Sequence, residues 1–276
     1  MKAAFASLVV MSLLGTLTGL AGAQERQRPE RRDEAPGREH FQLKVGAAYD
    51  QGDFGTSETT RAFFVPVTFR YLGERFDVGA TASVIYLDTE SQVVVVDGVP
   101  TPVERQRRTD EAGFGDVILR GRYYAVDDRG VDSPIPGISP FLKVKVPTAD
   151  ESKGLGTGEW DVGFGVELDK RFREFFLLGD VSYTFIGDPP GQNFRNRPAA
   201  SFGIGRSFTP DFAVTALLDW RRALVKGRDD AVELVGLAQW RLSRTLTVTP
   251  NAFVGLTDGS PDFGVGVELS WRFGRY

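Results

Sequence analysis

The stretch EWDVGFGVEL, residues 159–168, alternates between two kinds of residue without a break. Its apolar positions are Trp160, Val162, Phe164, Val166 and Leu168, and the positions between them are charged or are glycine. Side chains along a β-strand point to opposite faces with a period of two. The stretch therefore predicts a strand that has one apolar face and one polar face.

The same alternation recurs from residue 41 to residue 273, and it predicts about twelve strands of about ten residues each. No run shows the i, i+3, i+4, i+7 spacing of an amphipathic helix. Successive connections also alternate. Short turns are expected at 72–75, 170–174, 208–211 and 242–245, and longer loops at 51–60, 88–112, 148–158, 187–194, 224–230 and 257–262. Short turns at one end and long loops at the other are typical of an outer-membrane barrel.

Aromatic residues gather at both ends of the apolar rows, and small or aliphatic residues occupy the middles. Tyr and Trp favour the boundary between membrane and water, because part of each ring system is apolar and part can form hydrogen bonds. A secreted two-sheet sandwich also alternates, but it has no reason to place aromatic residues at both ends of each row. The residues expected in the two aromatic girdles are Phe41, Tyr49, Tyr71, Tyr86, Tyr123, Trp160, Trp220, Trp240, Trp271 and Phe273.

These patterns predict an all-β fold: a single transmembrane, antiparallel, up-and-down β-barrel over residues 40–276, with short periplasmic turns and longer extracellular loops. Residues 1–23 resemble a cleaved signal peptide, with Lys2, an apolar run and Ala21-Gly22-Ala23 before Gln24. Residues 24–39 are charged and predict a flexible periplasmic leader. The expected location is the outer membrane of a Gram-negative cell.

Composition narrows the class of protein further. The formal net charge is −4, with acidic and basic residues interspersed, so nucleic acid is not an expected partner. There is no cysteine, which excludes disulfides, thiolate metal sites and thiol chemistry. The single histidine, His40, has no serine near it in sequence, so no catalytic residue, cofactor or metal site is predicted and an enzyme is not expected.

The polar face of the strands is expected to line the lumen. Arg120 and Arg122 should lie beside Lys143 and Lys145 as a basic ladder, with acidic residues on the strands that follow. One interpretation is a transverse field that filters solutes; the other is a set of ion pairs that braces a closed barrel. The lumen-lining candidates are Lys44, Arg70, Arg120, Arg122, Lys143, Lys145, Glu159, Asp161, Glu167, Asp180, Arg195, Arg197, Asp219, Arg221, Glu233, Arg241, Glu268 and Arg272.

Four motifs carry a family resemblance. They are Gly113-Phe114-Gly115-Asp116-Val117, Lys145-Val146-Pro147-Thr148 with Asp150, Gly154-Leu155-Gly156-Thr157-Gly158 with Asp161, and Tyr183-Thr184 with Gly187-Asp188. In these motifs the chain resembles the bacterial outer-membrane barrels assigned to transport in the meta-pathway of phenol degradation. The resemblance implies a β-barrel that transports small, often aromatic or hydrophobic molecules, without catalytic residues.

The expected function is therefore a transporter or channel for a small solute, with outer-membrane lipid and the barrel-assembly machinery as further partners. A closed barrel that meets a partner through loops 88–112 and 148–158 is the alternative, and a lipid-modifying enzyme is a more remote one. Loop 148–158 is a candidate to cap the mouth. The 88–112 segment is expected to extend a strand pair above the membrane, with a hairpin turn at Asp97-Gly98.

Overall fold

The structure is a computed structural model, and it describes residues 40–52, 59–89, 93–96, 99–102 and 109–274. The predicted signal peptide and leader, 1–23 and 24–39, lie outside these residues, as does the expected turn at Asp97-Gly98. The described chain forms an antiparallel sheet that closes on itself, with twelve strand positions around the wall. This confirms the predicted all-β barrel of about twelve strands.

The strands follow one another around the wall in chain order, and each pairs with its neighbours. They are β1 (His40–Gly52), β2 (Thr60–Leu72), β3 (Phe76–Thr89), β6 (Thr109–Phe114), β7 (Val117–Tyr123), β8 (Gly137–Val146), β9 (Asp161–Phe172), β10 (Phe175–Phe185), β11 (Arg197–Thr209), β12 (Phe212–Arg221), β13 (Ala231–Arg241), β14 (Leu246–Gly255) and β15 (Phe263–Phe273). β6 and β7 both pair with β3, so they share one position in the wall, interrupted at Gly115-Asp116.

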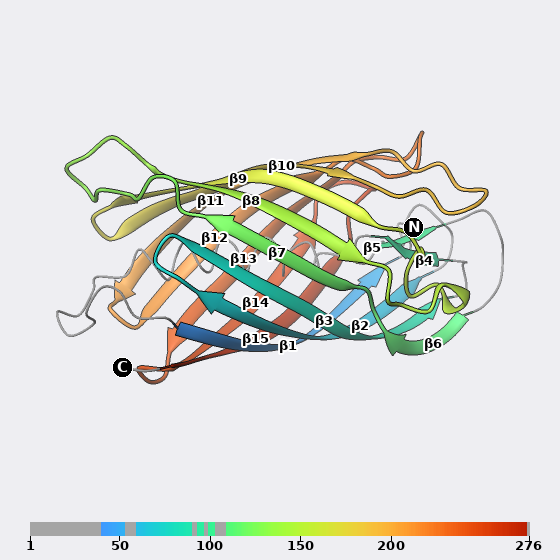
Figure 1. Cartoon of the computed structure of the whole chain (residues 1–276), viewed down its shortest axis with the longest axis horizontal. Coiled ribbons are helices and arrows are strands. Elements are labelled where there is room, and N and C mark those ends of the chain that lie inside the picture. The colour runs from blue at the N-terminus through green and yellow to red at the C-terminus, as the bar shows by residue number, and fades with distance from the viewer. Residues whose placement is uncertain (1–39, 53–58, 90–92, 97–98, 103–108, 275–276) are drawn as a thin grey trace.

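The first and last strands close the cylinder. β1 pairs with β15 from Phe41 opposite Phe273 to Gln51 opposite Phe263. This pairing removes the open edges of β1 and β15, and such closure is the condition for a sheet to span hydrocarbon. Figure 1 shows the strands running obliquely along the long axis, with the long loops and the β4 and β5 labels at the end opposite the C-terminus.

The two faces of the wall follow the predicted parity. On β9 the outward Phe164 is 50 % exposed and the inward Glu167 is 3 % exposed; on β12 the outward Leu218 is 47 % exposed. The strand predicted from residue 159 begins at Asp161 instead, so Glu159 and Trp160 belong to the preceding loop. The described part of the chain contains no helix with the length and apolarity needed to cross a membrane.

The inner face is less polar than the sequence suggested. A first buried apolar cluster lies on inward positions of β10, β12, β13 and β14, and a second lies nearer the long loops. The first consists of Phe176, Leu178, Ala213, Leu217, Val235, Leu237 and Phe253. The second consists of Ala48, Ala62, Phe64, Ile85, Leu87, Val95 and Leu155. The face that was expected to be polar therefore also carries apolar side chains.

The segment between β3 and β7 also differs from expectation. The wall is extended by β3 and β6, while β4 (Val93–Val96) and β5 (Val99–Pro102) pair only with each other as a separate two-stranded sheet. Val95 of β4 is 2 % exposed within the second apolar cluster. The hairpin therefore packs against inward side chains of the barrel, and does not simply prolong a strand pair.

Candidate functional site on the inner wall

One part of the inner wall carries a chain of ion pairs that begins at the seam between β15 and β1. The Lys44 ammonium lies 2.9 Å from Glu268 Oε1, and both side chains are almost fully buried. Beside this pair, the Gln42 amide donates to Ser270 Oγ at 2.8 Å and accepts from Arg70 at 3.3 Å. The contacts continue from Arg70 onto β3.

Asp77 is the next residue in this series of ion pairs. Its two oxygens lie 2.8 Å from Arg70 Nη2 and 2.7 Å from Arg122 Nη2. The Tyr124 hydroxyl also donates to Asp77. Arg122 continues to Glu167, and Glu167 accepts from Arg120 as well. We call this set the balanced network: Lys44, Arg70, Asp77, Arg120, Arg122, Glu167 and Glu268.

The predicted basic ladder lies within this region. Arg120 stands directly opposite Lys143 in the pairing of β7 with β8, so the two like charges are adjacent in the register. Glu167 on β9 reaches past β8 to both arginines. The Arg120 guanidinium also lies 4.0 Å from the ring centroid of Phe141, an inward residue of β8. The charges of both arginines are thus compensated by the Glu167 carboxylate, and Arg120 also contacts the ring of Phe141.

The adjoining part of the inner wall, on β10 to β13, has a different charge balance. The register places Asp180 opposite Glu167 and Ser201, Ser201 opposite Asp219, and Asp219 opposite Glu233. Like charges on directly paired positions destabilise a sheet unless another group compensates them. Ser201 donates to Asp180. Arg221 pairs with both Asp219 and Glu233.

Asp50 extends this region onto β1. Its side chain is fully buried, and its two carboxylate oxygens have no hydrogen-bond partner in the described structure. Asp219 Oδ2 and Glu233 Oε2 likewise accept no hydrogen bond. The name acidic wall is used below for a set of six buried residues. They are the carboxylates Asp50, Asp180, Asp219 and Glu233 and the arginines Arg197 and Arg221.

The family motifs meet at the end of the barrel that carries the long loops. Lys145 is fully buried, and its ammonium lies 2.8 Å from Thr157 Oγ1, 2.9 Å from Asp161 Oδ2 and 3.5 Å from Asp116 Oδ2. These four residues belong to three different motifs of the sequence. We call them the Lys145 cluster.

Residues 147–160, between β8 and β9, form a loop that we call the mouth loop. A second set of contacts fixes the start of this loop. Asp116 Oδ1 accepts from the backbone N–H groups of Thr148 and Ala149 at 3.0 and 2.9 Å. The Val117 N–H donates to Thr148 Oγ1 at 2.9 Å. Asp150 caps the short η1 helix (Glu151–Lys153), and hydrogen bonds from Ser152 hold the pKa of its exposed carboxyl below the ordinary value.

The mouth loop turns into the opening of the barrel. Leu155 at its tip is fully buried in the second apolar cluster, beside Phe64 and Ile85. The backbone carbonyl of Gly154 accepts from the Val95 N–H at 2.7 Å, which joins the loop to β4. The motif residues therefore anchor a loop that covers part of the mouth.

The remaining predicted lumen residues are dispersed. Glu159 and Arg195 lie in loops, before β9 and before β11 respectively. Arg241 and Arg272 occupy inward positions at the short-turn end of β13 and β15 and are partly exposed. Sequence reasoning did not include Asp50 or Asp77 among the lumen candidates, and it missed the apolar inward positions Phe176 and Phe253. Runs of consecutive apolar residues, such as Phe175–Leu178, were the available signal for an apolar inner face.

The aromatic residues expected in the girdles lie on outward positions. At the short-turn end Phe41 stacks with Phe273 at 5.8 Å between centroids and contacts Tyr71 at 5.7 Å, and Trp271 lies 5.1 Å from Phe273. At the long-loop end Tyr49 lies 6.4 Å from Phe263. The members with the largest exposed fractions are Trp160, Trp240, Tyr123, Trp271 and Tyr86, at 57, 56, 53, 50 and 42 %.

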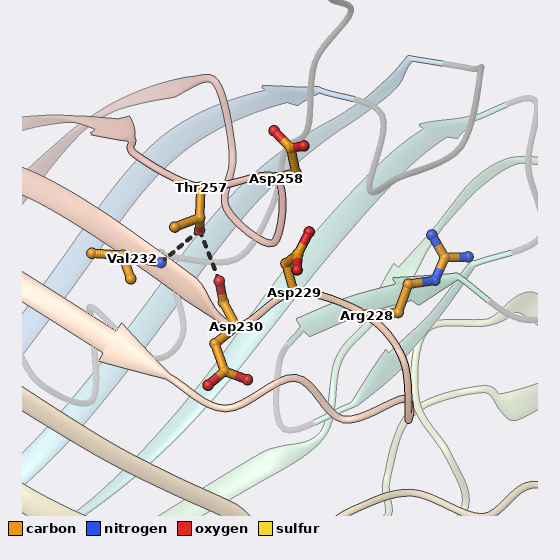
Figure 2. A pocket seen from close by; sticks show the side chains of 6 residues that line it. All are labelled: Arg228, Asp229, Asp230, Val232, Thr257 and Asp258. Atoms are coloured by element: carbon orange, nitrogen blue, oxygen red, sulfur yellow. Dashed lines mark hydrogen bonds between the residues drawn. The ribbon is translucent and has the colours of Figure 1, made fainter.

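A surface hollow of about 620 Å³ lies between the loops that follow β12 and β14. Figure 2 shows Thr257 joining the two loops: its hydroxyl donates to the Asp230 carbonyl at 2.8 Å and accepts from the Val232 N–H at 3.1 Å. The Asp230 carboxylate already accepts from Trp220 Nε1 and the Ala223 N–H. These contacts stabilise a loop junction outside the barrel.

A family model and several solved structures are similar to this chain. A family model described as "Putative MetA-pathway of phenol degradation" matches residues 35–273. An outer membrane channel from Pseudomonas putida F1 superimposes with a TM-score of 0.61 at 11% identity, over 89% of this chain and 100% of that one. The KdgM porin in complex with disordered oligogalacturonate gives 0.48 at 6% identity, over 85% and 99%. The transport unit of the autotransporter AIDA-I from Escherichia coli gives 0.48 at 10% identity, over 95% and 97%.

Proposed function

This chain belongs to the MetA-pathway phenol-degradation family, and from that premise we propose that it spans the outer membrane as a channel for small solutes. Aromatic or otherwise hydrophobic solutes are the expected cargo, in keeping with the description of the family. Outer-membrane lipid surrounds the apolar outer face in this proposal, and the barrel-assembly machinery inserts the chain.

One observation carries the proposal: the sheet closes through β1 and β15, with apolar side chains outside and most of its charged side chains inside. A water-soluble protein gains nothing from exposing Phe164, Leu218 and Trp271. In a bilayer the same residues meet lipid, and pairing of β1 with β15 lets the strands of the wall bond to one another. The inner wall then supplies the polar surface along which a solute moves.

Reconstitution of the full chain in planar lipid bilayers tests the proposal. Stepwise conductance in KCl is expected with the folded protein, and none with detergent alone or with heat-unfolded protein. Liposome swelling with neutral solutes of graded size measures the width of the path. A folded, inserted barrel that gives neither conductance nor swelling would contradict the channel.

A second candidate rests on the mouth. Leu155 and Val95 pack together over inward residues, as in a barrel that is closed and presents its loops to a partner. Conductance separates the two functions, since a permanently closed barrel gives none. We propose no enzymatic role for the barrel.

A further inference from the structure

Two basic side chains of the outer face differ in how the protein compensates their charge. Lys170 of β9 and Arg206 of β11 both stand in outward rows of apolar residues near the short-turn end. Lys170 is 7 % exposed, and it pairs with the Asp128 carboxylate and donates to the Gly130 carbonyl at 2.7 Å. The segment between β7 and β8 therefore supplies Lys170 with its acceptors.

Arg206 is exposed and lacks such acceptors. Its contacts in the described part of the chain are with two aromatic rings, and no described carboxylate pairs with it. Its guanidinium carbon lies over the Phe175 ring at 5.2 Å from the centroid, and over the Phe208 ring at 5.1 Å. In the next turn, Asp211 lies 3.9 Å from Arg241 instead.

The ring contacts leave the hydrogen-bonding capacity of Arg206 available. A cation over an aromatic ring interacts through the face of the ring, whereas the guanidinium N–H donors lie in the guanidinium plane. The outward neighbours of Arg206 in the pairing with β10 and β12 are Phe175 and Val214, which offer no side-chain acceptor. An acceptor for these donors therefore has to come from outside the described chain.

The level of Arg206 on the wall indicates the source of that acceptor. Phe208, Phe212 and Trp240 form a row of rings at the short-turn end, with centroids 6.0 and 6.4 Å apart. Such rings mark the boundary between membrane and water. Arg206 is the outward residue that precedes Phe208 on β11, so its long side chain reaches the level of the lipid headgroups.

We propose that Arg206, held between Phe175 and Phe208, binds the phosphate group of an anionic glycerophospholipid. A guanidinium matches the geometry of phosphate and can donate two parallel hydrogen bonds to it. The acyl chains would lie along Ile204 and Phe202, the next outward residues of β11, which are 49 and 59 % exposed. The site rests on the proposed membrane span, which places this lipid in the periplasmic leaflet, but it does not require that the barrel conducts.

The charge at this site favours an anionic lipid over a zwitterionic one. A choline headgroup carries its own cation, which offsets the phosphate charge, whereas a glycerol headgroup leaves the full negative charge to Arg206. One basic residue near a membrane surface attracts an anionic lipid by an amount that corresponds to about a fivefold change in affinity.

Native mass spectrometry of the folded full chain, released from an uncharged detergent, tests the site. The probes are dioleoylphosphatidylglycerol and dioleoylphosphatidylcholine, which have the same acyl chains. We expect the native chain to retain the phosphatidylglycerol with about fivefold higher affinity. Inorganic phosphate at the same concentration should not displace it, because free phosphate lacks the contacts of the acyl chains with the wall.

Variants locate the site. Arg206→Gln should abolish the preference for phosphatidylglycerol, and Arg206→Lys should retain part of it, because an ammonium keeps the charge but loses the bidentate geometry. Arg244→Gln is the matched control: it makes the same charge change on an exposed residue of the turn between β13 and β14, and it should leave the preference unchanged.

Three results would overturn the proposal: equal affinity of the native chain for the two lipids, an unchanged preference in Arg206→Gln, or an equal loss in Arg244→Gln. The comparison of lipids uses the native chain, so it holds even if a variant fails to fold. A barrel that selects phosphatidylglycerol but never conducts would keep the site and lose the channel. A barrel that conducts without this selectivity would keep the channel and lose the site.

Discussion

The balanced network and the acidic wall occupy the same inner face and are built from the same residue types, yet their charges are arranged differently. In the balanced network every carboxylate has a basic partner, and Asp77 and Glu167 each have two. In the acidic wall Arg221 pairs with Asp219 and Glu233, Asp180 accepts from Ser201, and Asp50 has no hydrogen-bond partner among the described residues.

This difference separates two uses of charge inside a barrel. Pairs that satisfy one another hold neighbouring strands in register, and removal of one partner leaves an uncompensated buried charge. The acidic wall has fewer such pairs, so its carboxylates contribute less to holding the strands in register. Of the two interpretations offered by the sequence, ion pairs that brace the barrel describe the balanced network, whereas a transverse field that filters solutes stays a prediction.

The largest expected effect is in the balanced network. Asp77→Asn removes the carboxylate shared by Arg70 and Arg122, and it should lower the free energy of unfolding by about 3–5 kcal/mol. Urea unfolding of the barrel in lipid vesicles measures the change. Asp88→Asn breaks a surface pair with Arg61 and should cost less than about 1 kcal/mol. Equal costs for the two variants would show that the network is not a brace.

The comparison also depends on which side chains of β12 face inward. Leu218→Arg places a charge on the outer face and should impair insertion by about 2–4 kcal/mol. The fraction of folded barrel recovered in vesicles reports the effect. Asn251→Arg on β14 is the control, because that partly exposed residue faces inward. If both variants insert equally well, the assignment of faces is wrong.

A smaller effect is expected at the Lys145 cluster, next to the balanced network. Lys145→Met leaves Asp161 and Asp116 without their ammonium partner, a loss of about 1–3 kcal/mol for the local structure. The mouth loop should then be cleaved more rapidly by protease, and conductance should rise. Lys153→Met is the matched control, since Lys153 is 41 % exposed in its pair with Glu111. Unaltered cleavage in Lys145→Met would show that this cluster does not anchor the loop.

The smallest effect is predicted in the acidic wall. Glu233→Gln leaves Arg221 paired with Asp219 and removes a like charge opposite that carboxylate. Stability should change by no more than about 1 kcal/mol, in either direction. Urea unfolding under the conditions used for Asp77→Asn makes the two halves directly comparable. A loss as large as that of Asp77→Asn would remove the distinction between them.

The fold was predictable because lipid imposes a strict period of two on the outer face. The alternation at Val162, Phe164 and Leu168 therefore fixed the strand and its outward side from local sequence alone. The inner face is under no such constraint. Leu217 and Phe253 belong to one buried apolar cluster on that face, built from β10, β12, β13 and β14. A cluster that joins strands distant in sequence leaves no local sequence pattern.

The site was predictable in part. Parity placed Lys44 and Glu167 on the inner face, but it did not identify the partner of each, because Glu167 reaches Arg122 across an intervening strand. Asp50 was visible as an inward position, but its lack of a partner depends on Gly264 and Phe253, which are distant in sequence. The motifs around Lys145 indicated the family, whereas their role in anchoring the mouth loop required the folded geometry.

The most direct test of the account is the reversal potential of single channels across a KCl gradient in a planar bilayer. The excess of carboxylates on the acidic wall predicts cation selectivity that is reduced in the Asp50→Asn, Glu233→Gln double variant. Anion selectivity in the native barrel, or a reversal potential that the double variant leaves unchanged, would contradict it.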